Sequence, residues 1–537
     1  MDILKRELTR RELMKLAATG AAGTSLAALL DRQTLAAAPA SAAGAGETIR
    51  RGGTLRVVVQ TDFQSMWPTM SENASPWDCF DPLFKWRQDE KGKWMPMPGL
   101  AESWELGPSK AILKIRQGVK FHDGSSLDAE AVRWNLEQMR NNPKSSLQRH
   151  LAPIDPKNVA RALDKYTLQI NLTAPFASLP VILSDFEYPA QIVSKTAFEK
   201  LGEAGLSRQA VGTGPFRLVK WESGTGLTVK RFEDYWEKGG DGKPLPYLDE
   251  VVYRFIPQDA VRMVEMRTGN ADFSDFIPAK DVPALRNDPS LVYHQNEFVA
   301  SIYYFFFNAQ KPPFNENLKL RQAVQHAIDR EAIAKVVGLG LGKPVKYHFT
   351  PGTVGYDESV PYYWYNPERA KQLLKEAGYP NGLDVTLSIV ARDIEQQQAE
   401  MMKQMLDAVG IRTTIDAMEQ LAWSTKVLKA RNFQLATRRN LSQPDPDRVL
   451  TMDWTASSLA GAEIQELNQL ATEGRASFDP QRRHQIYVRA QKIMYDSSWW
   501  GYLWMMPRNY LLSKRVRNFP KDIWATFMRE RELWLAS

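Results

Sequence analysis

Histidines, paired carboxylates and a nucleophile in a sharp turn are the features that could give this chain metal or hydrolytic chemistry. The histidines are His122, His150, His294, His326, His348 and His484. No two of them lie two to five positions apart, the spacing at which one helix or turn presents two ligands to a metal ion. A nucleophile elbow and an acid pair in a recognisable context are missing too. We therefore expect a protein that is not an enzyme and that holds no metal or cofactor.

His122 lies next to Asp123 in the segment FHDG, residues 121–124. A histidine beside a carboxylate could form a catalytic dyad, and the alternative is a turn before a helix. Ser126 and Asp128 are both favourable helix N-cap residues, and an apolar-periodic run follows them. We interpret FHDG as the turn that precedes this helix.

Two glycine-rich segments, GTGPF (212–216) and GLGLG (338–342), do not fit a nucleotide site. Neither is followed in register by the Lys-Ser/Thr pair of a phosphate-binding loop. GLGLG follows a helical pattern, whereas a dinucleotide fingerprint follows a strand. We interpret both segments as turns.

Composition and charge exclude two further classes. The chain has 537 residues and a formal net charge of +7. This length supports more than one core, because single cores stop growing near roughly 250–300 residues. Beyond residue 52 no basic run exceeds a pair, so we predict no nucleic-acid partner. Cys79 is the only cysteine, which excludes an intramolecular disulfide, and we predict that its thiol is buried and inert.

The first 42 residues have the pattern of an export signal. A charged start runs to Lys15, a small-residue apolar stretch follows, and Ala40-Ser41-Ala42 fits a cleavage site. The segment TRRELMK (9–15) resembles a twin-arginine signal, and the alternative is an ordinary secretory signal with a chance arginine pair. We predict a signal at 1–42, a linker at 43–50 and a mature chain in the periplasm.

Hydrophobic periodicity predicts a mixed first half and an α/β second half. The first half contains short strands such as 55–59, 111–116 and 167–172, and a hairpin-like pair that ends near Phe232. The second half predicts helices at 317–337 and 367–377, then strand 383–390, helix 394–409, strand 411–418, helix 419–430 and strand 432–438. This alternation favours a mostly parallel sheet covered by helices, and the two halves together favour two lobes.

Seven segments follow one another in an order that resembles a known family. They are PGLAESWEL (98–106), ILKIRQGVKFHDGSSLDAEAVRWNLE (112–137), GTGPFRLVKWESG (212–224), RFEDYWEKG (231–239), FNAQKPPFNENLKLRQAVQHAIDREAI (307–333), YNPERAKQLLKEAGYP (365–380) and PDPDRVL (444–450). Together they resemble family 5 of the bacterial extracellular solute-binding proteins, which includes dipeptide-, oligopeptide-, nickel- and opine-binding receptors. The resemblance covers nearly the whole mature chain.

The resemblance implies a two-lobed α/β periplasmic-binding-protein fold of the large type, with an extra α+β subdomain and a hinged cleft. Lobe I would comprise 51–96, 213–305 and 508–537. The extra subdomain would comprise 97–212, and lobe II would comprise 306–507. The implied mechanism is hinge closure over a buried ligand, which the ligand's additional contacts in the closed state must drive.

Aromatic and sulfur-containing side chains fall where family members line the cleft. The resemblance places Met66 and Trp67 in the first loop of lobe I, Trp423 in lobe II and Trp504 near the return crossing. Cleft walls combine apolar surface with a few fixed polar groups. For each of these four residues a place in the core is the alternative.

The segment ATRRNLSQPDPDRVL (436–450) suggests the ligand's charge. In dipeptide-binding relatives an aspartate three residues before the Asp-Pro-Asp motif pairs with the ligand's ammonium group. Anchoring on Asp445 places Ser442 there, and a hydroxyl cannot neutralise a buried ammonium. Arg439 takes a position where relatives often have tryptophan, and Arg438 precedes it. Arg392 matches a region where relatives present an arginine to a carboxylate, and the alternative for all three arginines is a structural ion pair.

We therefore predict a receptor of an ABC importer that captures a small ligand and delivers it to a membrane permease. The ligand would be a peptide, an opine or another anionic solute, because a guanidinium offers two parallel hydrogen bonds to a carboxylate. The receptor would act as a monomer. The alternatives are a periplasmic hydrolase and a ligand receptor for a sensor or chemoreceptor.

Overall fold

The computed structural model describes residues 48–70, 77–88, 94–185, 190–275, 277–443, 445–454, 460–520 and 530–537. All of them belong to one unit, residues 43–537. The predicted export signal, 1–42, and most of the predicted linker lie outside the described residues. No helix in these ranges is long and apolar enough to cross a membrane.

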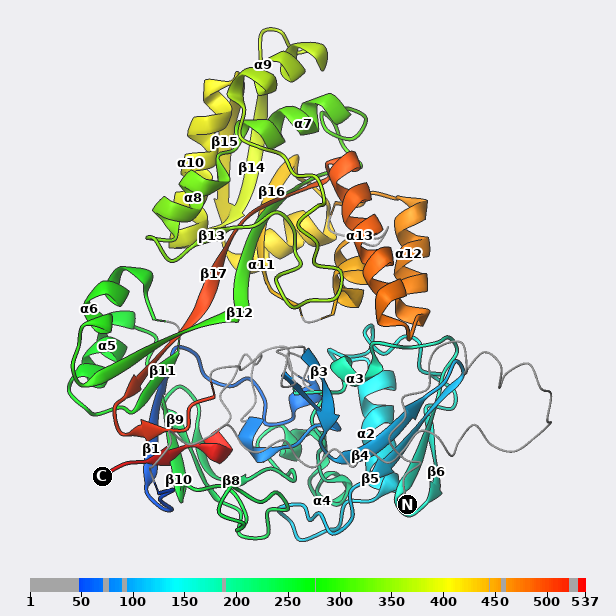
Figure 1. The fold of residues 1–537 in the computed structure, drawn as a ribbon, viewed down its shortest axis with the longest axis vertical. Coiled ribbons are helices and arrows are strands. Elements are labelled where there is room, and N and C mark those ends of the chain that lie inside the picture. Colours follow the sequence, from blue (N-terminus) through cyan, green and yellow to red (C-terminus); the bar gives the residue numbers. More distant parts are fainter. Residues whose placement is uncertain are drawn as a thin grey trace, which may run out of the picture. The chain divides into compact units, whose positions relative to one another are not determined.

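The largest sheet contains strands from both halves of the chain. Its strands are β1 (Thr54–Val59), β8 (Phe216–Glu222), β9 (Gly226–Arg231), β10 (Glu250–Phe255), β11 (Phe273–Asp275), β12 (Leu291–Phe307), β13 (Lys343–Pro344), β14 (Leu383–Val390), β15 (Ile411–Met418), β16 (Leu435–Leu441) and β17 (Trp500–Ser513). Their order is β15-β14-β16-β12-β17-β11-β1-β10-β9-β8, with β13 on β17. The two longest strands, β12 and β17, are antiparallel neighbours at its centre (Figure 1).

The strands β14, β15 and β16 form a parallel α/β unit, as the periodicity predicts. β14 pairs in parallel with both β15 and β16. The connecting helices are α10 (Asp393–Ala408), then α11 (Gln420–Trp423) followed by a π-helical turn at Ser424–Lys429. The bounds of β14 and β15 agree with the predicted strands. Figure 1 shows α10 and α8 on one side of these strands, with α12 and α13 on the other.

The other helices of the second half largely follow prediction. They are α7 (Leu318–Ala327), α8 (Arg330–Val337), α9 (Pro367–Glu376), α12 (Gln465–Ala476) and α13 (Pro480–Ser497). The single helix predicted at 317–337 is wrong, because the chain breaks between α7 and α8. Asp329 takes extended backbone angles there, and its side chain accepts a hydrogen bond from the Ala332 amide and so caps α8.

A second, four-stranded sheet and its helices build the region that contains FHDG. The sheet has the order β4-β5-β7-β6, with β4 (Ala101–Leu106), β5 (Lys110–Ile115), β6 (Ala160–Asp164) and β7 (Thr167–Asn171). Helices α2 (Ala129–Asn141), α3 (Leu179–Ile182) and α4 (Lys195–Leu206) and the hairpin β2 (Phe84–Gln88) and β3 (Trp94–Pro98) complete this region. Asp128 caps α2, and His122 contacts the carbonyl of Gly214 at 2.9 Å. FHDG is therefore the turn before a helix, as interpreted.

The long strands β12 and β17 pass from one hydrophobic core to another. Residues 300–307 of β12 pack with the helices α7 to α13, while Leu291 packs with α5 (Asp259–Arg267) and α6 (Val282–Arg286). The register of the pair shifts between Asn296 and Ala300, between these two cores. The chain thus has the two-lobed fold, and β12 and β17 are the described strands that run through both lobes. The exact lobe boundaries remain a proposal.

Candidate ligand-binding site

The parallel strands β14, β15 and β16 end at one edge of the sheet. Ligands of open α/β sheets bind outside this carboxyl edge. Arg392 follows β14, Gln420 follows β15, and Arg439 lies near the end of β16. The parallel arrangement of the strands therefore places these three residues at the same edge, although they are far apart in the sequence.

Arg392 and Arg439 meet at the carboxylate of Glu395, in the first turn of α10. Arg392 Nη1 lies 3.4 Å from Glu395 Oε1, and Arg439 Nε lies 3.7 Å from the same oxygen. Arg392 Nη2 also donates to Gln420 Oε1 at 2.8 Å. The Glu395 side chain is 6% exposed, whereas both arginine side chains are 41% exposed. Two guanidinium groups share one carboxylate, so Glu395 balances only one of their two positive charges.

Aromatic side chains lie beside Arg439 on the same face of the sheet. In the β12–β16 register Tyr303 lies opposite Arg439. Tyr303 stacks on Trp504, with ring centroids 4.3 Å apart, and Trp504 Nε1 donates to Gln398 Oε1 at 2.8 Å. Burial raises the pKa of Tyr303, although the charge of Arg439 opposes that rise. Trp504 is fully buried, and Tyr303 lies between it and Arg439 in the row of cross-strand neighbours.

Arg438 does not join this pair. Neighbouring residues of a strand point to opposite faces of the sheet. In the register with β12, Arg438 lies opposite Tyr304 and Arg439 opposite Tyr303. The structure therefore separates the three predicted arginines into Arg392 with Arg439 on the α10 face and Arg438 on the other face.

Ser442 is fully buried just after β16 and joins the end of this strand to β12. Its hydroxyl accepts a hydrogen bond from the Ala300 amide at 3.1 Å, and its own amide donates to the Ala300 carbonyl at 2.9 Å. Ala300 is the residue at which β12 resumes its pairing with β17 after the register shift. Ser442 thus brings no charge to the site and stabilises the strand crossing.

Both carboxylates of the Asp-Pro-Asp motif are held by arginines. Asp445 accepts hydrogen bonds from Arg483 Nη1 at 2.7 Å and from Arg483 Nη2 at 2.8 Å. Asp447 accepts from Arg475 Nε at 2.9 Å. Burial opposes the charge of Arg483, but Asp445 outweighs it and raises the pKa of the guanidinium. These ion pairs satisfy the charge of Asp445 within the protein, so its predicted contact with the ligand stays a prediction.

The remaining predicted site residues pack in hydrophobic cores. Met66 is fully buried, and Trp67 stacks on Trp134 at 6.2 Å between ring centroids. Trp423 is buried, and its Nε1 donates to the Ser388 carbonyl at 3.4 Å. Cys79 is buried, as predicted. The cleft role of Met66, Trp67 and Trp423 stays a prediction.

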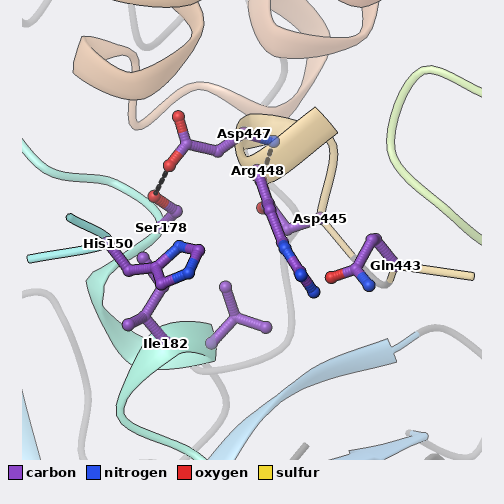
Figure 2. A pocket seen from close by; sticks show the side chains of 8 residues that line it. His150, Ser178, Ile182, Gln443, Asp445, Asp447 and Arg448 are labelled. Atoms are coloured by element: carbon purple, nitrogen blue, oxygen red, sulfur yellow. Dashed lines mark hydrogen bonds between the residues drawn. The ribbon is translucent and has the colours of Figure 1, made fainter. Parts of the chain in front are cut away.

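A pocket lies where the loop after β16 meets the segment around α3. Its lining residues are His150, Ser178, Val181, Ile182, Gln443, Asp445, Asp447 and Arg448. Figure 2 shows the side chains of His150, Arg448 and Gln443 among those that line it, with Ile182 on the same side as His150. Ser178 Oγ donates to Asp447 Oδ2 at 2.8 Å across the boundary between the two walls. Sequence reasoning missed His150, Ser178 and Arg448 as pocket residues, because nothing in their sequence context connects them.

Comparison with known proteins agrees with this architecture. A sequence model of the bacterial extracellular solute-binding proteins, family 5, matches residues 95–460, which is more than half of the chain. The chain belongs to this family. Family 5 members are solute-binding proteins, which supports binding as the role of this chain.

Individual family 5 proteins match over most of the chain. The glutathione-binding protein GsiB of Salmonella paratyphi A is 31% identical over 409 residues, which cover 72% of this chain and 76% of that protein. The structure of the DppA periplasmic binding protein of Helicobacter pylori with the peptide STSA superposes with a TM-score of 0.76 at 24% identity, over 90% of this chain and 98% of that one. AgaA of A. tumefaciens R10 with agropinic acid gives 0.74 at 25% identity, over 90% and 99%.

Proposed function

We propose that this chain is the receptor of an ABC importer for an anionic, peptide-like ligand. The observation that carries the proposal is the pair Arg392 and Arg439 on the single buried carboxylate of Glu395. Each guanidinium keeps unused donors, and Arg–carboxylate hydrogen bonds with parallel geometry are among the strong ones. A ligand carboxylate would balance the excess charge.

The residues that could meet an ammonium group favour the same conclusion. Ser442 is neutral and bonded to Ala300. Asp445 and Asp447 are each paired with an arginine. If Asp445 bound the ammonium group of a ligand, Arg483 would stay buried without its charge partner. Breaking a buried ion pair in this way costs about 3–5 kcal/mol. The loop therefore suits a ligand whose recognition relies on carboxylates.

Glutathione is the first compound to test. The relatives at about 30% identity are named glutathione-binding proteins. Glutathione carries two carboxylates, so it offers a partner to the Arg392/Arg439 pair. Opines also carry carboxylates, and AgaA was solved with agropinic acid. Both compounds offer a carboxylate to the Arg392/Arg439 pair.

We also propose an export route, a monomeric state and a membrane partner for this chain. The mature chain would work in the periplasm as a monomer after twin-arginine export, and it would dock on a membrane permease. Family membership supports an extracellular place of action. Fractionation of cells that carry Arg10→Lys and Arg11→Lys, compared with the unchanged chain, tests the route, and light scattering of the mature protein tests the monomer.

Calorimetric titration of the mature protein with glutathione and with its diethyl ester tests the ligand class. We expect binding of glutathione and much weaker binding of the ester, which lacks both carboxylates. Arg439→Gln and Arg392→Gln should each lower the affinity about 10–100-fold, because a hydrogen bond to a charged group contributes about 1.5–3 kcal/mol.

Arg412→Gln is the matched control. Arg412 lies at the start of β15, at the amino ends of the parallel strands and so away from their carboxyl edge. Its side chain is 55% exposed and pairs with Asp384. Its replacement should leave the affinity unchanged. Equal affinities of the wild type and both site variants would contradict the role of this pair, and tighter binding of the ester would contradict the anionic ligand.

A further inference from the structure

Arg438, on β16, begins a row of side chains that crosses the large sheet on the face away from α10. In the register of the strands, Arg438 lies opposite Tyr304 of β12, and Tyr304 lies opposite Tyr502 of β17. The two tyrosine rings are 5.6 Å apart between centroids. Cross-strand neighbours on one face are in reach of each other, so the row places a guanidinium beside two phenol groups.

The π-helical turn Val449–Trp454 follows the Asp-Pro-Asp motif and lies against this row. The indole Nε1 of its last residue donates to Tyr502 Oη at 2.8 Å. Asn440 Nδ2 donates to Asp453 Oδ2 at 3.4 Å. Asn440 follows Arg438 by two residues on β16, so both side chains are on the same face of the sheet. The turn therefore brings the carboxylate of Asp453 to the face that carries the guanidinium of Arg438.

Neither of these two charges has an ion partner in the described part of the chain. Asp453 is 7% exposed, and the long contact with Asn440 is its hydrogen bond to a described side chain. Arg438 is half-buried and forms no ion pair with a described residue. Asp445 and Asp447 differ, because each is held by an arginine. A buried carboxylate without a cation is costly, so a cation from outside the protein would stabilise Asp453.

The Tyr304 hydroxyl lies near both charges. Burial raises the pKa of Tyr304. The charges of Arg438 and Arg448 oppose this rise, and the charge of Asp453 adds to it. The hydroxyl also lies near Asn440, but it makes no hydrogen bond of ordinary geometry with a described residue. A guanidinium, a carboxylate and a buried hydroxyl are therefore close together without satisfying one another.

We propose that Arg438 and Asp453 bind a free amino-acid end of the ligand, with the Tyr304 hydroxyl as a third hydrogen-bonding group. Arg438 would donate to the carboxylate of this end, and Asp453 would accept from its ammonium group. Both charges of an α-amino acid are attached to one carbon atom, so its site needs opposite charges that lie close together without pairing. The inference rests on the proposed receptor function and identifies the part of the ligand that is recognised on this face of the sheet.

Glutathione has one end of this kind. Its γ-glutamyl residue carries an ammonium and a carboxylate on the same carbon atom, whereas its glycyl end carries a carboxylate alone. The γ-glutamyl end therefore matches Arg438 with Asp453, and the glycyl end does not.

Two analogues of glutathione separate the two charges of the γ-glutamyl end. Glutaryl-cysteinylglycine lacks only the ammonium group, and 4-aminobutyryl-cysteinylglycine lacks only the carboxylate of this end. In calorimetric titration of the mature protein, each analogue should bind about 10–100-fold more weakly than glutathione, because each loses a charge-assisted contact. Equal affinities of the wild type for all three compounds overturn the inference.

Two variants test which residue meets which charge. Asp453→Asn should weaken the binding of glutathione about 10–100-fold but leave that of glutaryl-cysteinylglycine nearly unchanged, because this analogue has no ammonium to lose. Arg438→Gln should weaken glutathione in the same way and leave 4-aminobutyryl-cysteinylglycine nearly unchanged. Equal losses for glutathione and the matching analogue overturn the assignment. Asp384→Asn is the control, since that side chain is 82% exposed and pairs with Arg412, and it should change neither affinity.

Free L-glutamate separates this inference from the choice of glutathione as the ligand. At millimolar concentration L-glutamate should raise the Tm of the mature protein, whereas glutarate and 4-aminobutyrate, which each lack one of the two charges, should not. A rise that Asp453→Asn abolishes, in a protein that does not bind glutathione, supports the site and contradicts glutathione as the ligand. Glutathione binding that does not depend on the ammonium group overturns this inference alone. The absence of a response to both L-glutamate and glutathione also overturns it.

Discussion

Ser178 donates its hydroxyl proton to Asp447 Oδ2 at 2.8 Å and so joins the segment before α3 to the loop after β16. The same carboxylate receives the guanidinium of Arg475, whose backbone carbonyl accepts from the Ala177 amide. Asp447 is 3% exposed. One buried carboxylate therefore organises the contact between the two walls of the pocket.

Replacing the partners of Asp447 should have unequal effects on stability. Ser178→Ala removes one hydrogen bond and should lower the free energy of unfolding by about 1 kcal/mol. Arg475→Met leaves the buried carboxylate without its charge partner and should cost about 3–5 kcal/mol. Urea unfolding followed by tryptophan fluorescence measures both. Ser290→Ala, in an exposed turn with Asp288, is the control and should change little.

Local signals explain why much of the fold could be predicted from the sequence. The strands β14 and β15 and the helix α10 were found because their hydrophobic periods lie within short windows. The break at Asp329 was missed, because an apolar stripe runs across both α7 and α8 and hides the cap between them. The central pairing of β12 with β17 joins distant parts of the chain, and no local pattern encodes it.

The arrangement of the candidate site could be predicted only in part from the sequence, and the limit has a physical cause. Arg392 and Arg439 were both named from the resemblance, and the structure places them on one carboxylate. Arg438 was grouped with them because the direction of a side chain depends on strand register, which the sequence does not show. Arg483 and Arg475 lie 38 and 28 residues from their aspartates, so their pairing has no local signal.

A substitution of Trp504 tests whether its side chain packs in the core or contacts the ligand. Its ring lies parallel to Tyr303, with an interplanar angle of 4°, and its indole nitrogen bonds Gln398 in a fully buried place. Trp504→Phe keeps the stacking but leaves the Gln398 oxygen without this donor, which should cost about 1–3 kcal/mol of stability. We expect glutathione affinity to change less than about twofold. Affinity and stability are measured by calorimetric titration and by urea unfolding.

Trp364→Phe is the control for this substitution, since that side chain is 63% exposed and should tolerate the change. A loss of glutathione affinity of tenfold or more in Trp504→Phe, at unchanged stability, would show that Trp504 contacts the ligand. The packing role assigned to it beside Tyr303 would then be wrong.

A buried ion network makes the free energy of unfolding depend on pH in the range below the ordinary pKa of a glutamate. Glu237 accepts a hydrogen bond from Arg531 Nη1 at 3.0 Å and pairs with Lys85. Burial alone would raise the pKa of Glu237, but Lys85 and Arg531 outweigh it and hold the pKa below its usual range. A carboxylate whose pKa is lower in the folded state stabilises the fold above its unfolded value of about 4.3 and loses this contribution as the pH falls.

Glu237→Gln should therefore lower the free energy of unfolding at pH 7, because the substitution leaves Lys85 and Arg531 without this negative charge. The difference in the free energy of unfolding between the variant and the wild type should shrink steadily below about pH 4.3. Urea unfolding at pH 7, 5, 4 and 3 follows that difference. Glu222→Gln is the control, because Glu222 is 54% exposed and its ion pair with Lys220 lies at the surface. A difference that stays constant from pH 7 to pH 3 would mean that the charge of Glu237 does not stabilise the folded state.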